Sequence, residues 1–141
     1  MKISLALGVA ILTLLAAVPP SFAQVVAEEA IQEYLDFSTY EAGIIMPAQL
    51  TEDVFNDFLF VDTRDEEQFN NETIPGAINI EWREILLSKD ELPEDKKIIL
   101  FCNTGTLSAQ AMFALRVIGY ENALVLQTGF RGWLSDAAYK P

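Results

Sequence analysis

The chain has 141 residues, of which 51% are hydrophobic, which is enough for one domain with a substantial core and too little for two ordinary domains. Its formal net charge of −12 excludes nucleic acid and anionic membrane surfaces as partners, because both would be repelled. The absence of histidine excludes Cys-His and Ser-His catalytic pairs and most zinc sites.

The first 23 residues have the pattern of a secretory signal peptide. Lys2 precedes an apolar run over residues 3–18, and the small residues Ser21 and Ala23 occupy the last positions before a cleavage site at Gln24. The alternative is an uncleaved membrane anchor, but the run is shorter than the about 20 residues of a spanning helix and is followed by two prolines. We therefore expect residues 1–23 to be removed on export, which leaves no stable membrane anchor and a net charge of −13.

The remaining sequence alternates between apolar runs and helical patterns. Residues 24–42 are predicted to form a helix and a connector, with an amphipathic pattern over residues 27–37 that packs on the outside of the domain. Five apolar runs are typical of short strands, at residues 43–46, 58–61, 77–80, 98–101 and 123–126. Short helical segments are expected at residues 47–50, 52–56, 65–69 and 81–87. A longer helix should follow the fourth apolar run and its loop and end at residue 118, and a short helix should follow residue 133. The pattern predicts an α/β fold over residues 43–141, with a mostly parallel five-stranded sheet flanked by helices on both faces.

The only cysteine, Cys102, follows the fourth apolar run and opens a loop of small polar residues. A strand, a tight loop and a helix N-terminus form a cup of backbone N–H groups that binds anions, and a thiol at its base has a lowered pKa. Gly105 tolerates the positive φ that such a loop requires, and hydroxyl donors come from Thr104, Thr106 and Ser108. We therefore predict that Cys102 is a nucleophile surrounded by the amides of residues 103–108.

Three chemistries use this arrangement: sulfur transfer, phosphate-ester hydrolysis and arsenate reduction. Phosphatases of the Cys-x5-Arg type need an arginine six residues after the cysteine, and this chain has Ser108 there. This position argues against phosphoryl transfer.

Four segments resemble the successive motifs of the rhodanese family, in the same order and with the same spacing. They are residues 61–64 (VDTR), 74–80 (IPGAINI), 102–108 (CNTGTLS) and 129–133 (GFRGW). The resemblance extends from about residue 43 to residue 133. The exported single-domain form is similar to the periplasmic, phage-shock-type rhodaneses, whose loops also begin Cys-Asn, so the resemblance implies a periplasmic protein.

The resemblance implies a sulfurtransferase that moves sulfane sulfur from thiosulfate or polysulfide to cyanide or a thiol through a persulfide on the catalytic Cys102. Its partner would be a small sulfur-containing anion or a protein persulfide, with no metal and no cofactor, and no oligomeric state is indicated. The expected substrate-binding residues are those of the loop and two arginines: Asn103, Thr104, Gly105, Thr106, Leu107, Ser108, Arg64 and Arg131.

The loop differs from the usual family pattern because it contains neither arginine nor lysine, and Leu107 stands where arginine is frequent. Arg64 is predicted to form a structural ion pair with Asp62, and Arg131 is the other candidate for an anion partner. Thr73 stands where the family commonly has histidine and is predicted to be structural.

The uncharged loop supports a second hypothesis, in which a rhodanese-like module without catalytic activity binds a partner protein. In that case the thiol would titrate near its free value of about 8.5. A third hypothesis is a redox protein that forms a mixed disulfide through Cys102 and needs an external thiol to resolve it.

Overall fold

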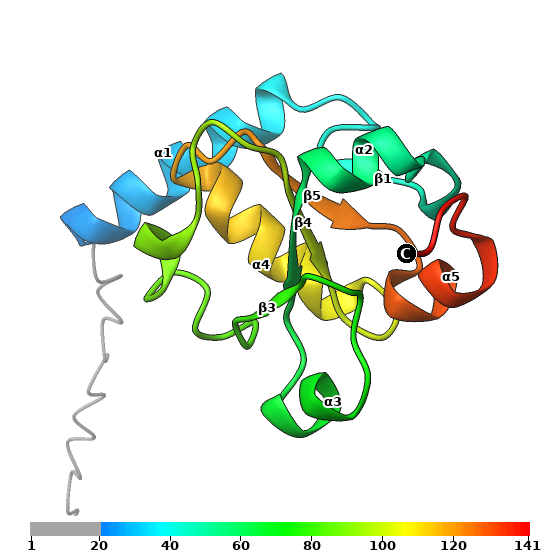
Figure 1. Ribbon diagram of the computed structural model, residues 1–141. Coiled ribbons are helices and arrows are strands. Elements are labelled where there is room, and N and C mark those ends of the chain that lie inside the picture. The colour runs from blue at the N-terminus through cyan, green and yellow to red at the C-terminus, as the bar shows by residue number, and fades with distance from the viewer. Residues whose placement is uncertain (1–20) are drawn as a thin grey trace, which may run out of the picture.

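Five short strands form one parallel sheet at the centre of the molecule (Figure 1). The computed structural model describes residues 21–141, so the apolar part of the predicted signal peptide lies outside the described residues. The order across the sheet is β1-β5-β4-β2-β3, and every neighbouring pair is parallel. This confirms the predicted fold class. The strands are β1 (Ile44–Ile45), β2 (Leu59–Asp62), β3 (Ile78–Asn79), β4 (Ile98–Phe101) and β5 (Ala123–Leu126).

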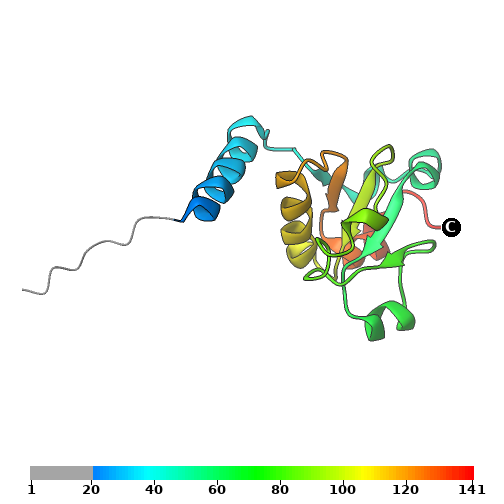
Figure 2. The same cartoon turned by 90° about the vertical axis from the view of Figure 1, so that its left-hand side faces the viewer.

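Helices cover both faces of the sheet, as the alternation of elements predicted. The helix α4 (Thr106–Val117) packs on one face, and α2 (Glu52–Asp57) and α5 (Gly129–Asp136) pack on the other (Figure 2). The short helix α3 (Glu66–Asn71) lies between β2 and β3 in the chain. Two 3₁₀ turns complete the described elements, η1 (Pro47–Gln49) and η2 (Lys89–Glu91).

The central strand β4 shows why its sequence is continuously apolar. Ile98 and Leu100 pack with α4, whereas Ile99 and Phe101 pack with α2 and α5, because successive side chains of a strand point to opposite faces. All four side chains are fully buried, and burying a side chain of this size stabilises a fold by about 1.5–3 kcal/mol. The strand is therefore held firmly on both faces, and so is the position of the residue that follows it.

The first helix, α1 (Phe22–Phe37), begins five residues earlier than the sequence pattern predicted, because the Ser21 side chain accepts a hydrogen bond from the N–H of Gln24 and caps it. It buries no residue and projects from the rest of the domain (Figure 2). It contacts α4, where the rings of Tyr34 and Phe113 meet edge to face at 5.2 Å. None of the helices within residues 21–141 has the length and apolar character needed to cross a membrane.

Two segments fold differently from their predictions. Residues 81–87 form successive turns instead of a helix. The N–H of Glu84 donates to the backbone carbonyl of Glu81, and the N–H of Leu87 donates to that of Glu84. The N–H of Trp82 is bonded to the carbonyl of Thr63, which ties this segment to the end of β2. The segment after β5 was expected to be a turn as far as residue 133, but α5 already begins at Gly129. Here tertiary packing overrides the low helix propensity of glycine.

Candidate active site

Cys102 lies directly after β4, at the edge of the sheet where the carboxyl ends of the parallel strands meet. Ligands bind at this edge in open α/β folds. The cysteine is 3% exposed and lines a pocket of about 290 Å³ that segments after β2, β3 and β4 form together. The pocket is lined by Thr63, Arg64, Asp65, Gln68, Glu81, Trp82, Arg83, Cys102, Asn103, Thr104 and Leu107.

Hydrogen-bond donors surround the Cys102 sulfur. The Ser108 hydroxyl lies 3.6 Å from Sγ, and the N–H groups of Ser108, Thr104 and Leu107 also interact with it. Burial by itself raises the pKa of the thiol, but these donors act in the opposite direction, and together they lower the pKa of Cys102 below its ordinary value. The predicted cup of N–H groups is therefore present, and it favours the thiolate.

The loop points its N–H groups at the sulfur because its carbonyls are bonded elsewhere. The N–H of Phe130 donates to the carbonyl of Cys102 at 2.7 Å, and the N–H of Arg131 donates to the carbonyl of Asn103 at 3.2 Å. Both donors belong to the first turn of α5, whose N–H groups have no partner within the helix. The start of α5 is thus the support on which the cysteine loop rests.

Close packing between the loop and α5 requires glycine at residue 129. A Cβ atom on Gly129 would lie 2.3 Å from the carbonyl oxygen of Cys102, and φ at this residue is +59°. On the loop side, Gly105 has φ +92° and immediately precedes α4, as the sequence predicted for a loop with inward-facing amides.

Arg64 lines the pocket, and its guanidinium is held by protein groups around it. Its guanidinium donates to the carboxylate of Asp62 at 2.6 Å, and both side chains are buried, at 6% and 0% exposure. This confirms the predicted structural ion pair. The same guanidinium donates to the Glu72 carbonyl and lies 4.5 Å from the centre of the Phe130 ring. Thr73 completes the arrangement by donating its hydroxyl to Asp62 at 2.8 Å, consistent with the structural role predicted for it.

The amide side chain of Asn103 connects the loop to its surroundings. Its oxygen accepts from Arg64 at 3.3 Å, and its nitrogen donates to the side chain of Gln68 at 2.7 Å. Gln68 is itself held by Asp65, which caps α3 and whose pKa is lowered mainly by the backbone N–H of Gln68. The chain of contacts fixes the loop relative to the end of β2.

The structure places the other expected substrate-binding residues in three different positions. Thr104 and Leu107 line the pocket, while Ser108 is fully buried beneath the sulfur. The Thr106 hydroxyl is exposed and pairs with that of Thr104. Arg131 is exposed on α5, and it is not among the residues that line the pocket with Cys102.

Arg83 was not among the residues predicted to bind a substrate, but it lies in the turns after β3 and lines the pocket. Its Nε donates to the Glu81 carboxylate at 3.0 Å, and its side chain is 72% exposed. The signal available in the sequence was an arginine a few residues after the third strand, at the same edge of the sheet as the cysteine. The predicted helix over residues 81–87 concealed it.

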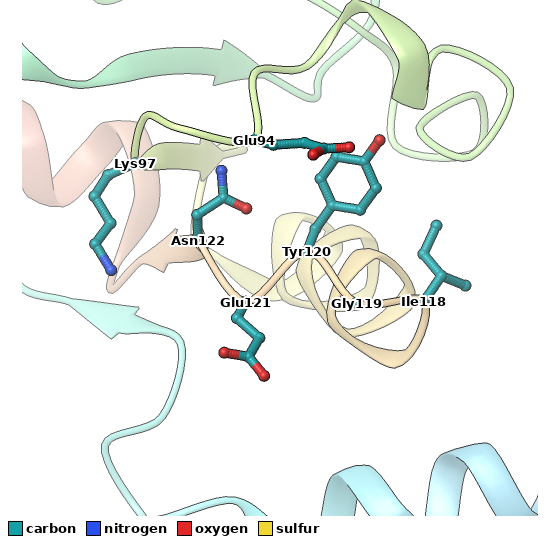
Figure 3. Close-up of a pocket in the computed structure, with 7 residues that line it drawn as sticks. All are labelled: Glu94, Lys97, Ile118, Gly119, Tyr120, Glu121 and Asn122. Carbon is teal, nitrogen blue, oxygen red and sulfur yellow. The ribbon is translucent and has the colours of Figure 1, made fainter.

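A larger pocket of about 550 Å³ lies at the opposite edge of the sheet, before β4 and β5 (Figure 3). The Asn122 side chain joins the two segments that line this pocket by donating to the backbone carbonyls of Pro93 and Lys96. The side chains of Lys97 and Glu121 extend away from Asn122. None of its lining residues is a cysteine or a serine. Within residues 21–141, no group of three or more acidic, cysteine or histidine side chains is arranged to hold a metal ion.

The fold and the cysteine loop together define a domain of the rhodanese type, and comparison with known proteins agrees. The model of the rhodanese-like domain matches residues 46–136, so the chain belongs to the rhodanese-like sulfurtransferase family. A sulfurtransferase from Allochromatium vinosum is 32% identical over 77 residues, which cover 55% of this chain and 72% of that protein.

Two further relatives show the range of the family. An adenylyltransferase and sulfurtransferase from Meyerozyma guilliermondii is 29% identical over 89 residues, which are 57% of this chain but only 21% of the relative. The crystal structure of a rhodanese-related protein from Thermoplasma volcanium superimposes with a TM-score of 0.61 at 26% identity, and the match covers 66% of this chain and 91% of that one.

Proposed function

We propose that the protein is an exported, periplasmic sulfurtransferase that moves sulfane sulfur from thiosulfate or polysulfide to cyanide or a thiol. The observation that carries this proposal is the ring of N–H and O–H donors around Sγ of Cys102, which lowers the pKa of the thiol. Membership of the rhodanese-like sulfurtransferase family supports the same chemistry. The phage-shock-type resemblance and the predicted signal peptide support the periplasmic location.

In the first half-reaction, the Cys102 thiolate attacks the outer sulfur of the donor. A new S–S bond forms at the cysteine, the S–S bond of the donor breaks, and its electron pair leaves with sulfite when the donor is thiosulfate. The outer sulfur of the resulting persulfide carries the negative charge. The N–H groups of the loop stabilise this charge as they stabilise the thiolate.

In the second half-reaction, the acceptor attacks the outer sulfur of the persulfide. The S–S bond at Cys102 breaks and the cysteine leaves as a thiolate, so that cyanide becomes thiocyanate and a thiol becomes a new persulfide. A lowered pKa makes Cys102 a better leaving group. The same donors therefore assist both halves of the cycle.

Intact-mass spectrometry tests the proposal directly. After incubation with thiosulfate or polysulfide, the mature protein should gain the mass of one sulfur atom, and cyanide should remove it. The Cys102→Ser variant should show neither change, because the attacking thiolate is missing.

A wild-type protein that gains no sulfur from either donor would contradict the proposal. If its thiol then also titrated near the free value of about 8.5, the result would favour the alternative of a non-catalytic module that binds a partner protein.

A further inference from the structure

We propose that Arg83 is the residue that binds the anionic end of the sulfur donor, in place of the cation that is missing from the cysteine loop. This inference rests on the proposed sulfurtransferase function and names the group that determines its donor specificity. Arg83 reaches the pocket from the turns after β3 and not from the loop itself.

The donor half-reaction requires a cation more than the acceptor half does. The Cys102 thiolate carries one negative charge and thiosulfate carries two, so the reacting groups bring three negative charges together in one pocket. The charge is the same after the transfer, when a persulfide anion and sulfite are present. Backbone N–H groups surround the thiol, but they supply no net positive charge to bind the donor.

Among the residues that line the pocket, Arg64 and Arg83 are the two cations. Every nitrogen of the Arg64 guanidinium donates to a protein oxygen: Nε and one terminal nitrogen to Asp62, and the other terminal nitrogen to Asn103. Its charge is neutralised by a buried carboxylate. Arg64 therefore positions the loop and does not contact a substrate.

Arg83 is also paired with a carboxylate, that of Glu81, but its side chain is 72% exposed and only part of its guanidinium is engaged. Its Nε is bonded to Glu81, and within residues 21–141 its two terminal nitrogens donate to no protein group. Glu81 also accepts from the N–H of Arg83, so the carboxylate fixes the backbone and the inner part of the side chain at once. Two parallel N–H groups thus remain for an oxyanion, which is the geometry in which arginine binds such groups best.

The other charged residues in the lining add to the effect expected of Arg83. Asp65 and Glu81 are negative, and Arg64 is paired with Asp62, so removing Arg83 makes the pocket more negative and should weaken the binding of an anionic donor. A neutral variant of Arg83 is expected to fold normally, since the side chain is 72% exposed.

Steady-state kinetics with thiosulfate and cyanide separates the two half-reactions, because kcat/KM for each substrate reports its own step. We expect Arg83→Gln to lower kcat/KM for thiosulfate about tenfold, mainly through KM, and to leave kcat/KM for cyanide within about twofold of wild type. Arg83→Lys should be intermediate, because lysine keeps the charge without the planar pair of donors. Added salt should raise KM for thiosulfate in wild type more than in Arg83→Gln.

The matched control is Lys97→Gln, which removes the same charge at the opposite edge of the sheet (Figure 3) and should behave as wild type. If Arg83→Gln keeps its kcat/KM for thiosulfate, or loses the same factor for both substrates, Arg83 does not bind the donor. Wild-type protein that acquires no sulfur would instead refute the proposed function itself. The mass measurement distinguishes these failures.

Discussion

At the scale of single residues, the chemistry depends on how a buried thiol becomes a thiolate. Desolvation alone would keep the proton on Cys102, and hydrogen bonds from the loop reverse that effect. The Ser108 hydroxyl has two acceptors within reach, Sγ of Cys102 at 3.6 Å and the Gly105 carbonyl at 3.1 Å. It has a single proton, so it can serve the sulfur when the thiolate forms and the carbonyl otherwise.

Ser108→Ala should therefore raise the pKa of Cys102. Because the pKa is lowered in the native protein, thiolate reactivity is present above that pKa and is lost as the pH falls through it. The midpoint of the wild-type alkylation rate with iodoacetamide, plotted against pH, should lie below the free-cysteine value of about 8.5. The midpoint for the variant should lie at a higher pH than that of wild type.

Ser135→Ala, which removes an exposed hydroxyl on α5, is the control and should leave the alkylation profile unchanged. A Ser108→Ala profile identical to that of wild type would show that the backbone N–H groups alone stabilise the thiolate.

At the scale of elements, the cysteine loop depends on α5, although the helix α4 and the strand β5 separate the two in the chain. The first turn of α5 binds the carbonyls of Cys102 and Asn103, and the contact is so close that only a glycine fits at residue 129. The aromatic rings of Phe130 and Trp133 then stack in the core beneath, at 5.7 Å. The shape of the loop is thus a property of two elements packed together.

Gly129→Ala should destabilise the protein and disorganise the loop together. The new methyl group would meet the Cys102 carbonyl at 2.3 Å with φ at +59°, and overpacking with backbone strain costs about 3 kcal/mol. Denaturant unfolding should show a lower midpoint, and sulfur uptake by Cys102 should fall even in native buffer.

Gly76→Ala provides the comparison, since φ there is +81° but no atom lies within 4 Å of the added group. This variant should be destabilised by backbone strain alone, and its thiol should remain reactive. Equal effects of the two substitutions on the thiol would contradict the role of α5.

At the scale of the whole molecule, the prediction of export rests on the N-terminal segment. The predicted cleavage between Ala23 and Gln24 lies in the first turn of α1 and would remove the Ser21 cap. Loss of a helix cap costs about 1 kcal/mol, and it would fray only the end of a helix that buries no residue. The domain around Cys102 would not be affected.

Expression of the full chain in a Gram-negative host should give a periplasmic protein whose first residue is Gln24. Ala23→Glu should block processing, because signal peptidase requires a small residue before the cut. N-terminal sequencing of the periplasmic and membrane fractions measures both. A wild-type chain recovered with its N-terminus intact would mean that the apolar segment is not a cleaved signal.

Local signals in the sequence determined much of this protein. Continuous apolar runs specify buried parallel strands, so β4 and β5 begin and end as predicted, and the strand–loop–helix order places Cys102 at a cup of N–H groups. The Asp62–Arg64 ion pair was also predictable, because its two residues are neighbours at a strand end. Each of these features has its signal in residues that are close together in the chain.

Only the tertiary structure decided what surrounds the thiol. Residues 81–87 form turns because Trp82 is bonded to the end of β2, and these turns bring Arg83 to the pocket while Arg131 stays on the outer side of α5. The helix at Gly129 likewise exists because its N–H groups meet the carbonyls of a loop more than twenty residues away in the chain. Contacts of this kind form between segments that follow different strands, and no local pattern in the chain encodes them.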